Sequence, residues 1–125
     1  MSECGVCIGS ELGDGEYPEF SDVTTPKSRR EHTCCECRRV IGVGEKYQRY
    51  VGKFDGEMYC EKTCLQCAEI REAFSCGGGW PFFGELWGEM HDAFPGLNSS
   101  CFDRLHTPEA KHFLRDKWMK WRGLA

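Results

Sequence analysis

An alternation of hydrophobic and polar residues marks the middle of the chain. Residues 40–41 begin one strand, residues 46–51 alternate as a second strand, and residues 57–60 form a returning strand. Asp55 and Gly56 lie between the last two strands. Such a pair favours a type I′ turn, because both central residues of that turn need a positive φ. The pattern therefore predicts a β-hairpin.

Hydrophobic residues at helical spacing follow the hairpin. Residues 64–74 predict a helix with Thr63 as its N-cap, and residues 82–94 carry a second hydrophobic stripe. The first helix offers for burial Leu65, Ala68 and Phe74. The second helix places on one face Phe83, Leu86, Trp87, Met90 and Phe94. Gly84 and Gly88 weaken this second prediction by ~1 kcal/mol each relative to alanine.

The last predicted helix has the clearest boundaries. Thr107 is typical of an N-cap, Pro108 suits the first turn, and Gly123 ends the helix. The face expected to be buried holds Ala110, Leu114, Trp118 and Trp121. The polar residues 10–33 and residues 95–106 predict loops.

The length of 125 residues and the hydrophobic content of 40% indicate a single domain over residues 1–125. We expect residues 34–74 to form its core, residues 1–33 a knuckle with an extended loop, and residues 80–125 a helical part. No stretch approaches the ~20 apolar residues of a membrane span, and the start of the chain lacks the features of a signal peptide. We therefore expect a cytoplasmic protein without membrane contact, in which clustered cysteines bind metal more often than they form disulfides.

Two CxxC pairs flank the predicted hairpin, namely Cys34 with Cys37 and Cys64 with Cys67. Two residues between ligands let both sulfurs reach one ion, and two such pairs complete a tetrahedron of four thiolates. The second pair opens the predicted helix, where free amides and the helix dipole favour the charged thiolate. This layout resembles the treble-clef zinc module over residues 34–74. The resemblance implies a small α+β metal-bound fold, with a zinc knuckle, β-hairpin and helix plus C-terminal helices, in which the zinc is structural.

A third CxxC pair, Cys4 with Cys7, suggests a second zinc site. The candidates for its two further ligands are Cys35, Cys60, Cys76 and Cys101. We favour Cys76 and Cys101, because they would tie the N-terminus to the C-terminal half of the chain. Two structural Zn²⁺ ions are then expected. The alternatives are a site that uses Cys35 and Cys60, or cysteines that are ordinary small buried residues.

Under the favoured assignment, Cys35 and Cys60 have no metal to bind. In a treble clef these two positions are close neighbours, so the residues could pack together or form a disulfide on oxidation. His32 could replace one sulfur of the first site, although a solvated loop histidine is the simpler interpretation.

Catalytic signatures are missing from the sequence. Treble-clef nucleases of the HNH type need one histidine in the hairpin and another on the helix, whereas residues 46–59 and 65–74 contain none. There is also no Ser/His/Asp signature, phosphate-binding loop or HExxH motif. We therefore expect that this protein is not an enzyme.

The net charge of −4 is spread unevenly. Residues 1–26 carry six acidic side chains and no Lys or Arg, whereas residues 27–75 carry ten basic and eight acidic ones. Basic and aromatic residues on a sheet can follow a nucleic-acid strand, but the overall acidity and the interspersed carboxylates argue against it. Aromatic anchors favour a protein partner. The candidate binding residues are Arg29, Arg30, Arg38, Arg39, Arg49, Lys53, Trp80 and Trp87.

Several segments together are similar to small, largely uncharacterised cysteine-rich proteins of tailed phages and prophages. These segments are the early CxxC, TCCECRRVIGVGEKY, KFDGE, KTCLQCAEIREAF and TPEAKHFLRDKWMKWRGL. The resemblance implies a phage-encoded accessory protein in the bacterial cytoplasm that binds a host protein, as an adaptor or as an inhibitor of defence or transcription machinery. The alternative is a nucleic-acid-binding zinc-finger regulator that uses the basic residues 27–53.

Overall fold

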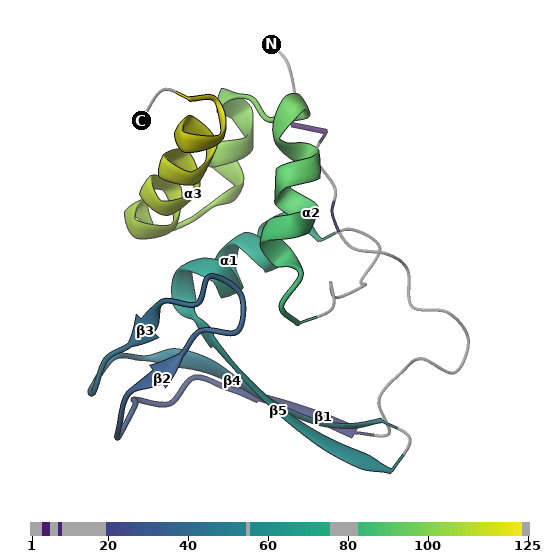
Figure 1. Ribbon diagram of the computed structural model, residues 1–125, viewed down its shortest axis with the longest axis vertical. Helices are drawn as coiled ribbons and strands as arrows, with labels where there is room; N and C mark the ends of the chain where they lie inside the picture. Colours follow the sequence, from purple (N-terminus) through teal and green to yellow (C-terminus); the bar gives the residue numbers. More distant parts are fainter. Residues whose placement is uncertain (1–3, 6–7, 9–19, 55, 76–82, 124–125) are drawn as a thin grey trace.

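A small mixed α+β fold is seen in the computed structural model, which describes residues 4–5, 8, 20–54, 56–75 and 83–123. The strands are β1 (Phe20–Thr24), β2 (His32–Thr33), β3 (Val40–Ile41), β4 (Tyr47–Phe54) and β5 (Glu57–Cys64). The helices are α1 (Leu65–Phe74), α2 (Leu86–Ala93) and α3 (Pro108–Trp121), with two short 3₁₀ helices, η1 (Phe94–Gly96) and η2 (Ser99–Arg104). The strands gather at one end of the molecule and α2 and α3 at the other, with α1 between them (Figure 1).

The predicted hairpin is confirmed and is longer than expected. Strands β4 and β5 pair antiparallel from Tyr47 opposite Cys64 to Phe54 opposite Glu57. Gly56 has a φ of +80°, as the predicted turn requires, while Asp55 lies outside the described residues. The hairpin therefore leads directly from the sheet into the N-terminus of α1.

Two of the predicted loops contain regular structure. The prediction of an extended loop over residues 10–33 is wrong where β1 and β2 form, because β1 pairs antiparallel with the edge of β4 and β2 with β3. A two-residue strand and an edge strand have too few alternating positions to be recognised from the sequence. Residues 95–106 likewise contain most of η1 and all of η2, so a plain loop was wrong there too.

The start of α1 also differs from the prediction. Strand β5 continues through Thr63, which lies opposite Gln48, and Cys64 takes the N-cap position instead. Leu65, which was expected to be buried, is 39% exposed, whereas Ile70 and the charged Arg71 are fully buried. The buried face of α1 consists of Cys67, Ala68, Ile70, Arg71 and Phe74, and Leu65 lies outside it.

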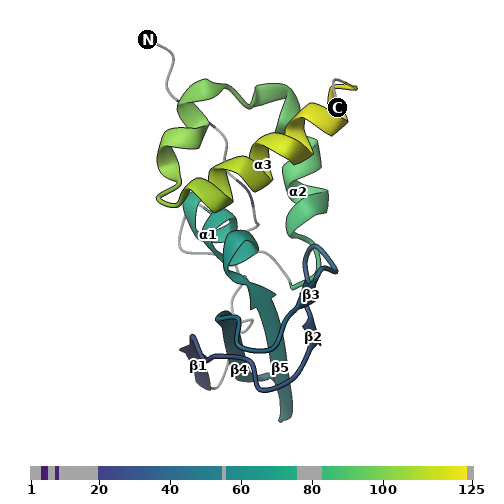
Figure 2. The same cartoon turned by 90° about the vertical axis from the view of Figure 1, so that its left-hand side faces the viewer.

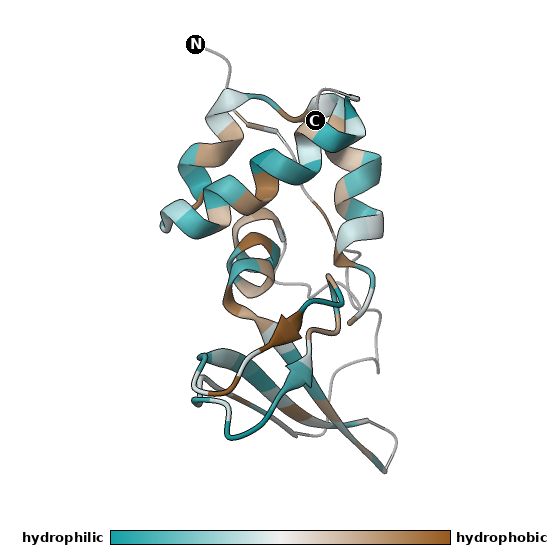
Figure 3. Cartoon of the chain, turned by 60° about the vertical axis from the view of Figure 1, so that its left-hand side comes forward, coloured by the Kyte–Doolittle hydropathy of each residue, from teal (hydrophilic) through white to brown (hydrophobic). Residues whose placement is uncertain are grey.

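The hydrophobic core lies where the three helices meet. Figure 2 shows α3 crossing α1 and reaching α2 at an angle, and Figure 3 shows hydrophobic segments on α1 at the centre of the molecule and on β3 beside it. The fully or almost fully buried side chains here are Ile70, Phe74, Leu86, Met90, Phe94, Leu97, Leu105, Ala110 and Leu114. Trp121, which was predicted on the buried face of α3, is 38% exposed.

Helix α2 begins only at Leu86, because Gly84 has a φ of +91° and ends the preceding turn.

Helix α3 begins and ends as predicted. The Thr107 side chain accepts a hydrogen bond from the Ala110 amide, and Gly123 has a φ of +77° just after the helix. Glu69 of α1 receives hydrogen bonds from the backbone amides of His106 and Thr107 and from the Thr107 hydroxyl. These bonds hold the N-terminus of α3 against α1. No helix in the described ranges has the length and apolar character to cross a membrane.

Candidate metal centre

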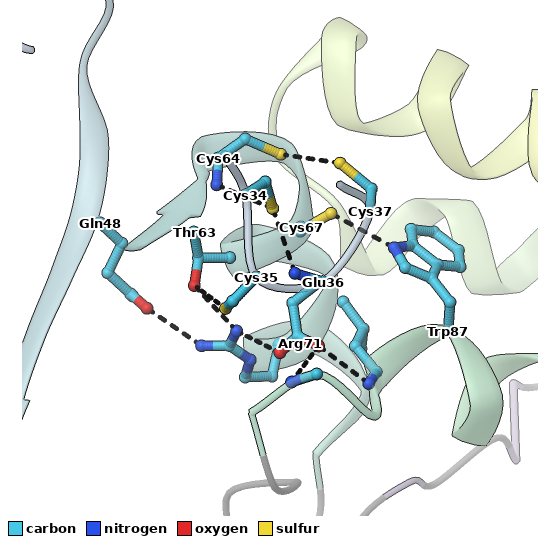
Figure 4. A network of polar contacts seen from close by, with 12 residues as sticks. Cys34, Cys35, Glu36, Cys37, Gln48, Thr63, Cys64, Cys67, Arg71 and Trp87 are labelled. Carbon is cyan, nitrogen blue, oxygen red and sulfur yellow. Dashed lines mark hydrogen bonds and ion pairs between the residues drawn. The ribbon is translucent and has the colours of Figure 1, made fainter. Parts of the chain in front are cut away.

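Four cysteine sulfurs converge where the sheet meets α1. Cys34 and Cys37 lie in the turn between β2 and β3, Cys64 ends β5, and Cys67 lies in the first turn of α1 (Figure 4). Their Sγ atoms all lie within 4.8 Å of one another, and those of Cys37 and Cys64 are 3.8 Å apart. A tetrahedral zinc with bonds of about 2.3 Å separates its sulfurs by about 3.8 Å. The four cysteines that the spacing predicts are therefore positioned to bind a metal.

Hydrogen-bond donors surround two of these sulfurs. The backbone amides of Glu36 and Cys64 donate to Cys34 Sγ at 3.4 and 3.3 Å. The indole Nε1–H of Trp87 on α2 donates to Cys67 Sγ at 3.3 Å. Such donors stabilise a thiolate without competing for the metal. This arrangement suits a charged sulfur ligand better than a neutral thiol.

The electrostatics of the cluster require a cation for full ionisation. Hydrogen bonds from Cys37, Cys64 and Cys67 lower the pKa of Cys34 far below the usual range of a thiol. Cys34 in turn raises the pKa of Cys64 and Cys67 far above that range. At Cys64 and Cys67 this raising of the pKa is larger than the lowering predicted from the helix N-terminus. The four thiols therefore do not all ionise near neutral pH without a metal, whereas a dication would let all four ionise.

A buried ion pair connects the turn of residues 34–37, here called the knuckle, to the rest of the protein. The fully buried Arg71 of α1 pairs with Glu36, which lies between Cys34 and Cys37. Glu36 also accepts hydrogen bonds from the backbone amides of Gly84 and Leu86 at 2.8 and 3.1 Å.

The same guanidinium reaches the sheet. Arg71 donates to Gln48 of β4 at 3.1 Å and to Thr63 of β5 at 3.0 Å. The knuckle, the sheet, α1 and the start of α2 thus share one network (Figure 4). The spacing of cysteines carries no sign of this network. The available signal for this network was Arg71 itself, a charged residue on the face of the helix expected to be buried.

The residues proposed for a second metal site are described only in part. Cys4 and Cys101 form a disulfide with a Cα–Cα distance of 4.8 Å, while Cys7 and Cys76 lie outside the described residues. Two described residues flank those cysteines in the chain. Ile8 forms a parallel bridge with Ser75, and its amide donates to the Phe74 carbonyl at 2.9 Å.

Cys35 and Cys60 have separate surroundings. Cys35 is half-buried, and its sulfur lies 3.3 Å from the Thr63 hydroxyl. Burial raises the pKa of Cys35. Cys60 is exposed on β5, and both thiols are free. His32, the alternative ligand, lies outside the cluster and packs against Tyr47 in a tilted arrangement with ring centroids 5.3 Å apart. Burial, followed by the nearby charges of Lys62 and Arg30, lowers the pKa of His32.

The predicted binding residues are scattered over several surfaces. Arg39 forms a bidentate pair with Glu45, which raises the pKa of Arg39, and Arg38 is exposed directly after the knuckle with a φ of +66°. Lys53 is half-buried in β4, and Trp80 lies outside the described residues. Trp87 is used within the fold, since it contacts Cys67, lies 5.5 Å from the Phe113 ring and has Lys117 Nζ 5.1 Å from its own ring.

Three of the predicted binding residues share one hollow. A pocket of about 740 Å³, here called the basic pocket, lies on the sheet and is lined by Pro26, Lys27, Arg29, Arg30, His32, Tyr47, Arg49, Cys60 and Lys62. Lys62 was missed as a binding residue because the returning strand was predicted to end at Cys60. Its place in β5, two residues before Cys64 of the cysteine cluster, puts it on the same face of the strand as Cys60.

Comparison with known proteins adds no relative. No protein-family model, no curated protein and no solved structure matches this chain.

Proposed function

We propose that this protein is a zinc-stabilised binding module in which the metal holds the fold and takes no part in chemistry. The observation that carries the proposal is the closed cluster of Cys34, Cys37, Cys64 and Cys67, whose four sulfurs would fill every position around a tetrahedral zinc. A catalytic zinc keeps a position open for water or substrate. The succession of knuckle, hairpin and helix supports a treble-clef arrangement of this site.

A second structural zinc on Cys4, Cys7, Cys76 and Cys101 is also part of the proposal. Cys7 precedes Ile8 and Cys76 follows Ser75 in the chain, and Ile8 and Ser75 pair with each other. Cys4 and Cys101 already lie side by side. A disulfide sulfur is not a thiolate, so the bond between Cys4 and Cys101 has to be reduced before these two residues can bind zinc.

The partner of the module follows from its surfaces. The phage resemblance names a bacterial host protein as the first candidate, and the net charge of −4 suits a basic one. The internal contacts of Trp87 remove one of the aromatic anchors on which that candidate rested. The basic pocket instead supports the second candidate, a nucleic acid.

Metal analysis of matched variants tests the structural role. In the reduced protein we expect about two zincs per chain, lowered to about one by Cys64→Ser and likewise by Cys4→Ser, because each variant breaks one four-thiolate set. The exposed Cys60→Ser is the matched control and should keep both metals. A folded, metal-free wild-type protein would refute the proposal.

Counting thiols separates the two states of Cys4 and Cys101. In the unfolded and metal-stripped protein, a disulfide hides two thiols from titration, whereas former zinc ligands all react. A second zinc together with a full thiol count supports the second site. One zinc together with a disulfide removes the second site from the proposal and leaves the first intact.

A further inference from the structure

We propose that the basic pocket binds the phosphate backbone of a single nucleic-acid strand. The inference rests on the proposed function, since it assumes a folded binding module, and it names the partner and the residues that hold it. The pocket-lining cations are Lys27, Arg29, Arg30, Arg49 and Lys62.

The lining of the basic pocket has a strong excess of positive charge. Five cations and no carboxylate line it, although the whole chain is acidic. The ion pairs in the described part of the chain are Arg39–Glu45, Arg71–Glu36 and Lys120–Asp116, and none of them involves these five cations. Converging cations without internal partners are suited to an anion that carries several charges.

Strand pairing in the pocket brings like charges together. Arg49 of β4 lies directly opposite Lys62 of β5, and Lys27 forms an antiparallel bridge with Lys46. Like charges directly opposite each other destabilise a sheet. Such a local loss of stability is expected where a bound anion neutralises the charges. The like-charge pairs therefore favour a binding surface over a surface that only contacts solvent.

The segment that supplies three of the cations is held in place before any ligand binds. The Tyr47 amide donates to the Pro26 carbonyl at 3.1 Å, and the Ser28 amide donates to the Glu45 carbonyl at 2.9 Å. Ser28 is only 4% exposed, and its hydroxyl donates to the Arg30 carbonyl. A preorganised set of cations loses less side-chain and backbone entropy on binding than a mobile loop does.

The shape of the pocket favours a single strand over a duplex. A duplex is read by helices or ribbons that protrude into its grooves, whereas this surface is a hollow of about 740 Å³, which is within the size range of ligand pockets. His32 lines the same hollow beside the cations and packs against Tyr47, which also lines it but is only 6% exposed. Aromatic rings interleaved with cations are typical of surfaces that bind single strands without sequence preference.

The pocket is also connected to the metal centre. Tyr47 lies opposite the metal-site residue Cys64, and Cys60, Lys62 and Cys64 alternate on one face of β5. Ordering of Cys64 by a metal therefore fixes one end of the strand that lines the pocket. Binding should require the metal-loaded protein, although the metal touches no ligand.

Fluorescence anisotropy with a labelled oligo(dT) of about 12 nucleotides tests the inference on the zinc-loaded, full-length protein. The test variant is Arg49→Gln/Lys62→Gln. The matched control is Lys111→Gln/Arg115→Gln, which removes the same charge from exposed positions of α3 outside the pocket. At about 100 mM salt we expect the test variant to bind roughly tenfold or more weakly and the control less than about twofold.

The salt dependence gives a second readout. Removing two phosphate contacts should reduce the slope of log K against log salt by about 1.4, since each contact to a single strand contributes about 0.7. Zinc content and helical circular dichroism should stay unchanged in the test variant. Its thermal stability should be equal or higher, because a like-charge pair is removed.

Four outcomes would overturn the inference. They are no binding by folded, zinc-loaded protein, equal weakening in the control, tighter binding of a duplex of the same length, and equal or better competition by polyglutamate at the same charge. The last result would assign the pocket to an acidic protein. Each of them leaves the zinc proposal standing, whereas absence of zinc from the folded wild-type protein overturns that proposal alone.

Discussion

The sheet end and the helical end of this molecule are held together by different interactions. The sheet end comprises β1 to β5 with the knuckle, and among its side chains whose burial is described the large buried hydrophobic ones are few, namely Ile41, Tyr47 and Tyr50. A cysteine cluster and a buried ion pair hold this end together in place of a large hydrophobic core. The helical end, α2 to α3, buries the hydrophobic residues Leu86, Met90, Phe94, Leu97, Leu105 and Leu114.

This difference indicates what a bound metal would contribute to a short chain. A small domain buries too little apolar surface to stabilise every part of itself, and a structural metal supplies the missing free energy locally. With such a metal, side chains on β4 and β5 at the sheet end do not all have to be hydrophobic and buried in a core. Five cations can therefore line one hollow on the sheet, whereas charges placed in a hydrophobic core would lose their hydration at a large cost in free energy.

Metal removal is the largest expected perturbation of this comparison. A chelator should cost the sheet end on the order of 10 kcal/mol, because zinc binding to four thiolates is coupled to folding. Amide hydrogen exchange should show lost protection in β4 and β5 and smaller losses in α3. Equal loss at both ends would mean that the two ends form one cooperative unit, and no change at either end would mean that the metal has no structural role.

Breaking the buried ion pair should have the next largest effect. Arg71→Met leaves Glu36 charged and unpaired in the interior, so chemical denaturation should show a loss of about 3–5 kcal/mol. Arg39→Met removes the partner of the half-exposed Glu45 and is the matched control, with an expected loss of about 1 kcal/mol or less. The double variant Glu36→Gln/Arg71→Met should be more stable than Arg71→Met alone. A loss from Arg39→Met as large as that from Arg71→Met would contradict the central place given to the buried network.

Deleting core volume should affect the helical end without disturbing the metal. Leu114 of α3 is fully buried, so Leu114→Ala should reduce the free energy of unfolding by about 2–5 kcal/mol. Lys111→Ala on the exposed side of the same helix should change it by less than about 0.5 kcal/mol. Zinc content should stay the same in both variants. If Leu114→Ala releases zinc, the two ends are coupled more tightly than their contacts indicate.

The two ends also differ in how much of their structure follows from sequence. Spacing alone places Cys34, Cys37, Cys64 and Cys67 together, because metal coordination imposes short local rules. The Thr107 cap and the Gly123 terminator of α3 follow from local backbone requirements in the same way.

What sequence could not supply are the features set by tertiary pairing. The edge strand β1 exists because β4 offers it a partner, and β5 extends to Cys64 because its register with Tyr47 allows it. The burial of Arg71 depends on Glu36 and Gln48, which are distant in sequence. The basic pocket combines β4 and β5 with residues 26–32, so no local pattern marks it.

The smallest effect concerns a hydrogen bond from the helical end to one sulfur of the metal centre. Trp87→Phe keeps a ring in place but removes the N–H that donates to Cys67 Sγ. The thiolates must lose their protons to hold a metal, so metal is released as the pH falls, and a donor to the thiolate delays that release. Trp87→Phe should therefore move the midpoint of zinc release upward by less than about one pH unit, as a zinc-indicator titration would measure. Trp118→Phe is the control, since its indole packs against Phe102 and Arg122 at the helical end, and its midpoint should not move. An unchanged midpoint in Trp87→Phe would mean that α2 only covers the metal centre and leaves its charge unaffected.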